Sequence, residues 1–122
     1  PNNIHNTHDS TVTQGDDWLS KFVPKIINSP TFNNTALFIV YEGKKHDASG
    51  FGSGKYAVTG GRLPLLLVSP FANKGFVSSL EYTHYNLLAT VEKILNLGNL
   101  GKGDASAKPM TDLFRILPAI RQ

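Results

Sequence analysis

The chain has 122 residues, of which 40% are hydrophobic and 17% charged, a length and composition that suit one globular domain with a hydrophobic core and exclude a disordered or fibrous protein. Its net charge of +3 is spread along the sequence without a basic stripe, and no apolar run approaches the roughly 18 residues of a membrane-spanning helix, so we expect neither a nucleic-acid partner nor a transmembrane segment. The absence of cysteine excludes disulfides and thiolate metal sites.

The first 14 residues are polar and lack apolar periodicity, which predicts a loop. This loop carries two imidazoles, a carboxamide and a carboxylate close together, on His5, Asn6, His8 and Asp9. Such groups can converge on a metal ion or an anion, since His and Asp are common ligands of zinc-like cations. The alternative is a terminal polar loop with incidental histidines. Because the chain starts abruptly at Pro1, we also expect it to be part of a longer protein.

A helix is predicted next, beginning at Gly15-Asp16-Asp17, where the acids would oppose the helix dipole in the first turn. Its end is predicted at Asn28-Ser29-Pro30, and Pro24 is expected to kink or split it. One broad apolar face is predicted to pack on a sheet; it is formed by Trp18, Leu19, Phe22, Val23, Ile26 and Ile27.

The segment Thr35–Gly43, TALFIVYEG, is predicted to form the buried central strand of the fold. Glu42 would then follow the strand at its C-terminal end, which is where open α/β sheets bind ligands. The alternative is a solvated acid at the start of a loop. The next 20 positions, Gly43–Arg62, are rich in glycine and predict a long functional or mobile loop without phosphate-loop spacing.

The apolar run Leu63–Val68 predicts a second buried strand beside the first, with Pro64 at its start. Phe76 and Val77 are predicted to form a short edge strand. A second helix is predicted over His84–Leu97, with Thr83 as its N-cap and Gly98 as its C-cap.

His84 falls in the first turn of this second helix, where backbone N–H groups and the helix dipole favour an anion. A purely structural histidine is the alternative. After the helix, residues 98–109 are rich in turn-forming residues and resemble a linker. Met110–Leu117 is predicted to form a short final helix capped by Thr111 or Asp112.

The order of these segments resembles the phosphoesterase family, which includes acid phosphatases and phospholipase C-like enzymes and belongs to the alkaline phosphatase superfamily. The resemblance extends from about Pro1 to Phe114 and corresponds to the C-terminal half of that family. Its more specific motifs are His8-Asp9 after Pro1-Asn2-Asn3, Ser69-Pro70 at a strand end, Tyr82-x-His84-Tyr85, and Met110-x-Asp112-Leu113-Phe114.

The resemblance implies an α/β fold, a partial alkaline-phosphatase-like sheet flanked by helices, with residues 1–122 as one phosphoesterase-like domain that is a C-terminal fragment of a larger one. It implies a metal-dependent hydrolase of phosphate esters, with a divalent metal ion as cofactor. By the same resemblance, His8 and His84 are catalytic candidates and Asp9 and Glu42 are metal ligands. His5 and Asn6 are assigned to substrate binding.

The alternative is a catalytically inactive, truncated or degenerate module with a binding or self-assembly role. Two departures favour it: Val40-Tyr41-Glu42-Gly43 lacks the Asp that the family usually carries, and Asn6 stands where an Asp is common. The family's nucleophile lies in an N-terminal half that these residues do not include, so we expect association with that half or with another copy. The resemblance also implies an extracellular or cell-surface location.

Overall fold

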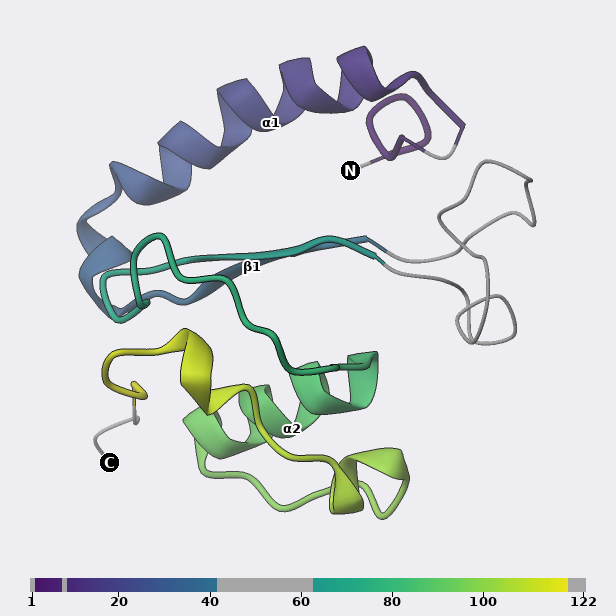
Figure 1. Cartoon of the computed structure of the whole chain (residues 1–122). Coiled ribbons are helices and arrows are strands. Elements are labelled where there is room, and N and C mark those ends of the chain that lie inside the picture. The colour runs from purple at the N-terminus through teal and green to yellow at the C-terminus, as the bar shows by residue number, and fades with distance from the viewer. Residues whose placement is uncertain (1, 8, 42–62, 119–122) are drawn as a thin grey trace. The chain divides into compact units, whose positions relative to one another are not determined.

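The computed structural model of the chain describes residues 2–7, 9–41 and 63–118 (Figure 1). Two of the site candidates, His8 and Glu42, lie outside the described residues, as does the glycine-rich loop that follows Glu42. The chain divides into two compact units, Pro1–Thr35 and Ala36–Gln122, and each is described by itself. Among the described residues, no helix is both long and apolar enough to cross a membrane.

The first unit consists of the N-terminal loop, the helix α1 (Val12–Ile27) and the short 3-10 helix η1 (Pro30–Asn34). The predicted start of α1 at Gly15 is wrong, because Thr11 and Gln14 form a capping box. The Thr11 hydroxyl accepts from the Gln14 backbone N–H at 3.2 Å, and the Gln14 amide oxygen accepts from the Thr11 N–H at 2.9 Å. Asp16 and Asp17 therefore lie beyond the first turn.

Helix α1 continues through Pro24 as one element, so the proline does not divide it. The predicted end is confirmed, since Asn28 is the C-cap and donates its N–H to the Pro24 carbonyl at 3.0 Å. On the apolar face the Trp18 and Phe22 rings stack with centroids 4.5 Å apart, as their spacing of four residues predicts.

The second unit contains the sheet, formed by β1 (Leu37–Val40) and β2 (Leu65–Val68). Both strands were predicted, but they pair antiparallel, so that Val40 at the end of β1 lies opposite Leu65 at the start of β2. The rule that ligands bind where parallel strands end does not apply to this pair. These findings confirm an α/β chain, and its described part contains a small two-stranded sheet.

The prediction that the strands are buried is wrong. Most of their residues are half-buried, and Val40 and Leu66 are 39% and 58% exposed. In the described part of the chain each strand has a single hydrogen-bonded neighbour. A strand of a large sheet has a neighbour on each side and a packed layer on each face, and the long apolar runs suggested that environment.

Helix α2 (His84–Leu95) begins as predicted at Thr83, whose backbone N–H donates to the Asn86 side chain at 2.7 Å. Its predicted C-cap at Gly98 is wrong, because the helix ends two residues earlier than Leu97 and Asn96 takes the left-handed conformation with φ of 52°. Asparagine tolerates this conformation better than other side chains apart from glycine, so it ends the helix first.

The C-terminal segment forms two short 3-10 helices, η3 (Gly103–Ser106) and η4 (Thr111–Leu113), and the predicted helix over Met110–Leu117 is wrong. Apart from the single turn of η4, its backbone pairs with the turn after β2. The Asn73 N–H donates to the Leu113 carbonyl and the Arg115 N–H donates to the Phe71 carbonyl, at 2.9 and 2.8 Å. Phe76 and Val77 form no strand, and Val77 is 83% exposed.

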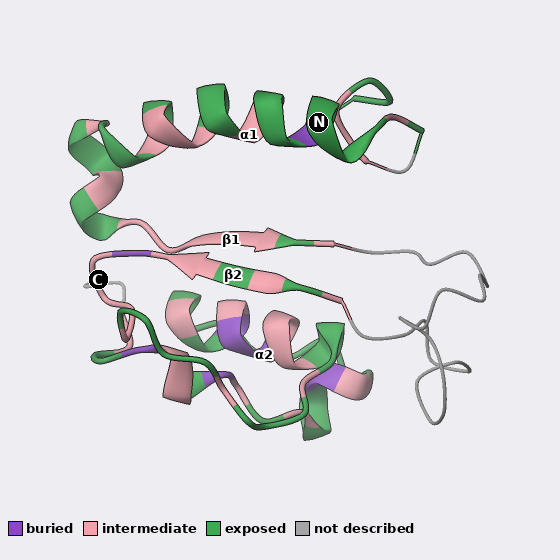
Figure 2. Cartoon of the chain, turned by 45° about the horizontal axis from the view of Figure 1, so that its top comes forward, coloured by how far each residue is buried: buried purple, intermediate pink, exposed green. Residues whose placement is uncertain are grey.

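The core of the second unit lies between α2 and the C-terminal segment (Figure 2). The buried hydrophobic residues among those described are Ala89, Met110 and Phe114, and Thr90 beside them is 0% exposed. Phe114 makes an edge-to-face contact with Phe38 of β1, with ring centroids 6.2 Å apart. Strand, helix and C-terminal segment are thereby joined into one unit.

Candidate functional site

In the N-terminal loop, Asn6 and Asp9 are linked by two hydrogen bonds. The Asn6 amide donates to Asp9 Oδ2 at 2.8 Å, and the Asp9 backbone N–H donates to Asn6 Oδ1 at 2.9 Å. His5 turns toward α1, where its ring stacks on Trp18 with centroids 6.0 Å apart. The structure thus brings Asn6 and Asp9 together and packs His5 against the helix.

The loop is fixed in this conformation by Thr7 and Gly15. Thr7 has a φ of 61°, a left-handed conformation that is costly for a β-branched residue. Its methyl group lies against buried Gly15, where an added Cβ would come 2.2 Å from Thr7 Cγ2. Glycine is needed here for close approach, which sequence reasoning missed because Gly15 was assigned to the start of the helix.

Carboxylate oxygens such as those of Asp9 suit a divalent cation. Asp9 is exposed at the surface of the loop. Within the described ranges, however, no three His, Cys, Asp or Glu side chains gather closely enough to hold a metal ion.

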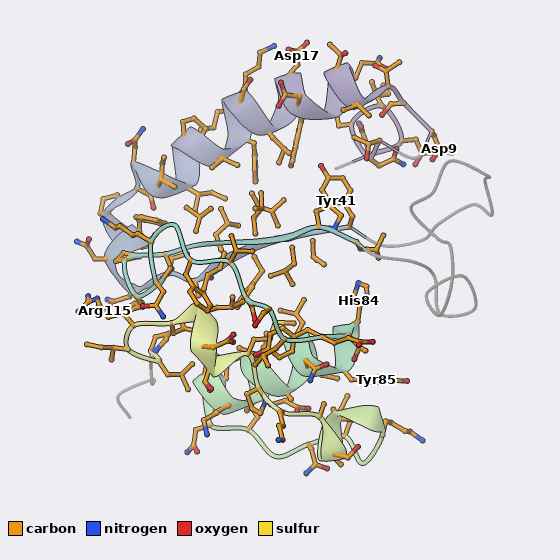
Figure 3. All side chains as sticks on the ribbon, in the orientation of Figure 1. Asp9, Asp17, Tyr41, His84, Tyr85 and Arg115 are labelled. Carbon is orange, nitrogen blue, oxygen red and sulfur yellow. The ribbon has the colours of Figure 1, made fainter. Side chains whose placement is uncertain are left out.

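In the second unit, His84 is exposed and its Nε2 lies 3.2 Å from the Tyr41 carbonyl oxygen, although the two residues are 43 positions apart (Figure 3). A carbonyl oxygen can only accept, so in the neutral imidazole Nε2 carries the proton and Nδ1 remains an acceptor. Tyr41 directly precedes Glu42 in the sequence. This contact joins the first residue of α2 to the residue that follows β1.

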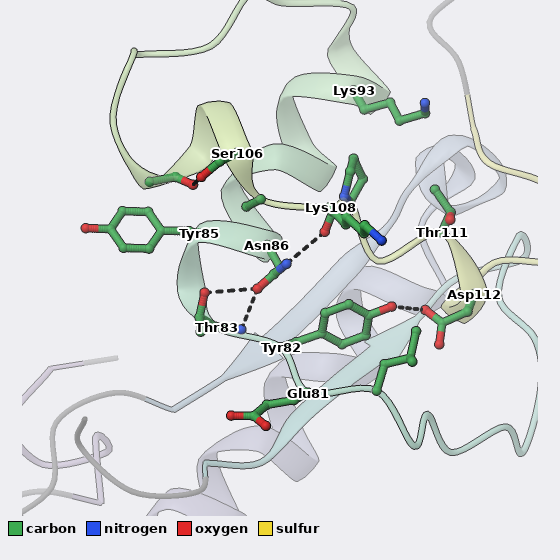
Figure 4. Close-up of a pocket in the computed structure, with 14 residues that line it drawn as sticks. Glu81, Tyr82, Thr83, Tyr85, Asn86, Lys93, Ser106, Lys108, Thr111 and Asp112 are labelled. Atoms are coloured by element: carbon green, nitrogen blue, oxygen red, sulfur yellow. Dashed lines mark hydrogen bonds between the residues drawn. The ribbon is translucent and has the colours of Figure 1, made fainter. Parts of the chain in front are cut away.

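A second polar cluster, which sequence reasoning missed, surrounds the carboxylate of Asp112. The Tyr82 hydroxyl donates to Oδ1 at 2.5 Å (Figure 4). The Ser78 hydroxyl donates to Oδ2 at 2.6 Å. Tyr82 and Asp112 belong to two of the motifs that carry the resemblance to the phosphoesterase family, yet nothing in their spacing showed that they touch.

Hydrogen bonding and burial shift the pKa values of Tyr82 and Asp112 in this cluster. Burial, followed by the hydrogen bond and negative charge of Asp112, raises the pKa of Tyr82 to about 12. Burial by itself would raise the pKa of Asp112, but the hydrogen bonds from Ser78 and Tyr82 outweigh it and hold that pKa below its usual value. Near neutral pH the cluster is therefore one carboxylate held by two neutral hydroxyls.

A third polar feature is a pair of buried acids, Glu92 on α2 and Asp104 in η3, which are 8% and 3% exposed. Asp104 accepts the backbone N–H groups of Leu100 at 2.6 Å and Lys102 at 2.9 Å, and so closes the turn after α2. Among the described residues, Glu92 Oε1 is a buried oxygen without a hydrogen-bond partner.

Burial, then the charge of Asp104 and a hydrogen bond to it, raises the pKa of Glu92. Burial acts in the same direction on Asp104, but its backbone hydrogen bonds and the one from Glu92 outweigh it and lower the pKa of Asp104. The two pKa shifts are opposite in direction, so Glu92 is the acid of the pair that binds a proton more readily.

This pair predicts a pH-dependent stability. Because the pKa of Glu92 is raised on folding, its contribution is complete below its unfolded pKa and is lost as the pH rises through the folded value. Glu92→Gln stays neutral, so we expect its unfolding free energy, relative to that of the unchanged chain, to improve as the pH rises above the ordinary glutamate pKa of about 4.3. Urea unfolding at several pH values measures this difference.

The exposed Glu81 provides the control, since Glu81→Gln changes the charge equally on the surface of the same unit. Its pH series measures the effect of removing one carboxylate from the surface of this unit, and the Glu92→Gln series is compared with it. If the unfolding free energy of Glu92→Gln, relative to that of the unchanged chain, did not improve with pH, folding would not raise the pKa of Glu92.

Comparison with known proteins identifies relatives of this chain. The model of the Phosphoesterase family matches residues 1–98. A phosphatidylinositol-3-phosphatase of Mycobacterium tuberculosis is 26% identical over 114 residues, which are 93% of this chain and 34% of that protein. An acid phosphatase of Aspergillus fumigatus is 28% identical over 110 residues, or 88% of this chain and 23% of the relative.

A plant protein is similar to the same extent. The non-specific phospholipase C6 of Arabidopsis thaliana is 29% identical over 150 residues, which cover 98% of this chain and 28% of that enzyme. The chain therefore spans between 23% and 34% of the length of these three relatives.

Proposed function

The chain belongs to the phosphoesterase family, and from that membership we propose that it supplies part of the active site of a metal-dependent phosphate ester hydrolase. Relatives named phosphatase, acid phosphatase and phospholipase C support hydrolysis of a phosphate ester. Because the chain spans at most 34% of those relatives, the proposal concerns a part of the site. The extracellular or cell-surface location inferred from the family stays a prediction.

The observation that carries the proposal is the hydrogen bond between His84 and the Tyr41 carbonyl. It holds the imidazole of His84 next to Tyr41, the residue that precedes Glu42. We therefore assign His84 and Glu42 to one site, although they are far apart in the sequence. With Nε2 donating to the carbonyl, Nδ1 of His84 is the atom that accepts or returns a proton. His8 is proposed as a second catalytic imidazole.

Asp9 and Glu42 are the proposed metal ligands, and Asn6 and His5 the proposed substrate contacts. Both ligands are carboxylates, and carboxylate oxygens suit hard divalent cations. A bound ion supplies Lewis acidity toward the phosphoryl oxygens. In the loop, the Asn6 amide orients Asp9 by donating to Oδ2, so Asn6 also acts on the carboxylate and not on substrate alone.

Metal titration of the purified chain tests the proposal. We expect Mn²⁺ binding in titration calorimetry, weakened at least about tenfold by Asp9→Asn and by Glu42→Gln, because each substitution removes a charged oxygen ligand. Asp17→Asn is the matched control, since Asp17 is an exposed acid on α1 away from the loop (Figure 3).

Hydrolysis of an aryl phosphate by the same chain, with manganese, zinc, magnesium or calcium and with a chelator, completes the test. Metal-dependent turnover that His84→Ala reduces would support the roles given above. A folded chain that binds no divalent ion and turns over no aryl phosphate would contradict the proposal and favour the inactive module.

A further inference from the structure

A hollow with a volume of about 840 Å³ opens in the second unit, between the segment that leads into α2 and the C-terminal segment (Figure 4). Its walls come from most of the residues between 80 and 86, from Lys93 on α2 and from residues 103, 106–109, 111 and 112. His84 is not among the lining residues, and its ring is directed toward Tyr41 instead. The hollow is therefore separate from the site proposed above.

Two lysines from different elements line this hollow, Lys93 on α2 and Lys108 between η3 and η4. Both side chains are exposed, and neither ammonium forms a hydrogen bond or an ion pair with another described residue. The hydroxyl of Thr111 also lines the hollow. A lysine carries three donors and no acceptor, so these groups can serve an anion and not a cation.

One of the two carboxylates that line the hollow already accepts hydrogen bonds within the unit. Asp112 accepts the hydroxyls of Tyr82 and Ser78, one on each oxygen. The other acid of the lining, Glu81, lies at the opposite end of the view from Lys93 in Figure 4. The Asn86 amide is also committed, because it donates to the Lys108 carbonyl at 2.9 Å and fixes the backbone that carries this lysine.

From this arrangement we propose that the hollow binds a phosphate group in its dianionic form, with Lys93 and Lys108 opposing its charge and Thr111 donating a hydrogen bond. The ammonium groups favour the negative charge of a phosphate, and its tetrahedral oxygens are acceptors enough for all three side chains. The phosphate can be free or can belong to the headgroup of a lipid that carries a terminal phosphate. This inference does not depend on the proposed hydrolase function.

Titration with inorganic phosphate at pH 8 and low salt tests the proposal, with a chelator present so that no phosphate is held through a metal ion. We expect calorimetric binding that Lys93→Met and Lys108→Met each weaken several-fold and that the double variant weakens at least about tenfold. Lys102→Met is the matched control, because Lys102 is exposed and does not line the hollow.

Phosphatidylcholine vesicles that contain phosphatidic acid distinguish the two sources of phosphate. Binding to these vesicles, but not to vesicles in which phosphatidylserine replaces phosphatidic acid, would assign the hollow to a lipid headgroup; phosphate binding alone would assign it to the free anion. The proposal is overturned if the chain binds neither probe, or if the double variant loses no more affinity than Lys102→Met. Both outcomes are independent of metal binding by Asp9 and Glu42.

Discussion

Phe114→Ala is expected to destabilise the Ala36–Gln122 unit by about 3–5 kcal/mol, the usual cost of deleting a buried aromatic ring. Phe114 is 6% exposed and touches Phe38 of β1 edge to face. Its backbone also forms an isolated bridge with Ala72. The substitution removes the ring that joins the strand to the C-terminal segment, so urea unfolding should begin at a much lower concentration.

Phe76→Ala is the matched control for this experiment, since Phe76 lies in the same unit but is 48% exposed. We expect it to cost about 1 kcal/mol or less, as for most surface substitutions. If the two alanine variants unfolded at the same urea concentration, Phe114 would not be part of the core.

Thr90→Val is expected to cost about 1–3 kcal/mol, although valine has nearly the same shape as threonine. Thr90 is 0% exposed, and its hydroxyl accepts from the buried N–H of Met110 at 2.8 Å while donating to the Asn86 carbonyl at 2.6 Å. Valine leaves the Met110 N–H buried without an acceptor. Urea unfolding measures the loss, and amide hydrogen exchange at Met110 locates it.

Thr90→Ser is the control that separates the hydroxyl from the methyl group. Serine keeps the acceptor for Met110, so we expect slow exchange of the Met110 amide and a loss of about 1 kcal/mol from the missing methyl. Slow exchange in Thr90→Val would show that Met110 does not depend on this hydrogen bond.

Both experiments concern contacts between residues that are far apart in the sequence, and these are the contacts that the sequence did not reveal. Local sequence signals predicted a helix at α2, yet they did not show that Thr90 and Glu92 on this helix are among the most buried residues. A polar residue is buried where a distant partner satisfies it, here the Met110 N–H for Thr90 and Asp104 for Glu92. No local pattern contains that information.

The candidate site, too, was only partly predictable from the sequence. The motif order pointed to the phosphoesterase family, and the family match over residues 1–98 bears this out. The cluster of Ser78, Tyr82 and Asp112 and the lysine-lined hollow were not anticipated, since Asp112 was expected to cap a helix. The roles given to His5, Asn6, Asp9 and His84, and to His8 and Glu42 outside the described residues, stay predictions.

The sequence by itself determined the family and the identity of the main elements, because apolar spacing, prolines and the cap at Thr83 act over a few residues. Tertiary structure alone decided that β1 and β2 run antiparallel and that residues 110–117 pair with the turn after β2 instead of forming one continuous helix. It also decided which acids are buried. These outcomes depend on contacts between residues that are from 12 positions apart, as for Glu92 and Asp104, to 44 positions apart, as for Phe71 and Arg115. Local preferences of the chain do not specify such contacts.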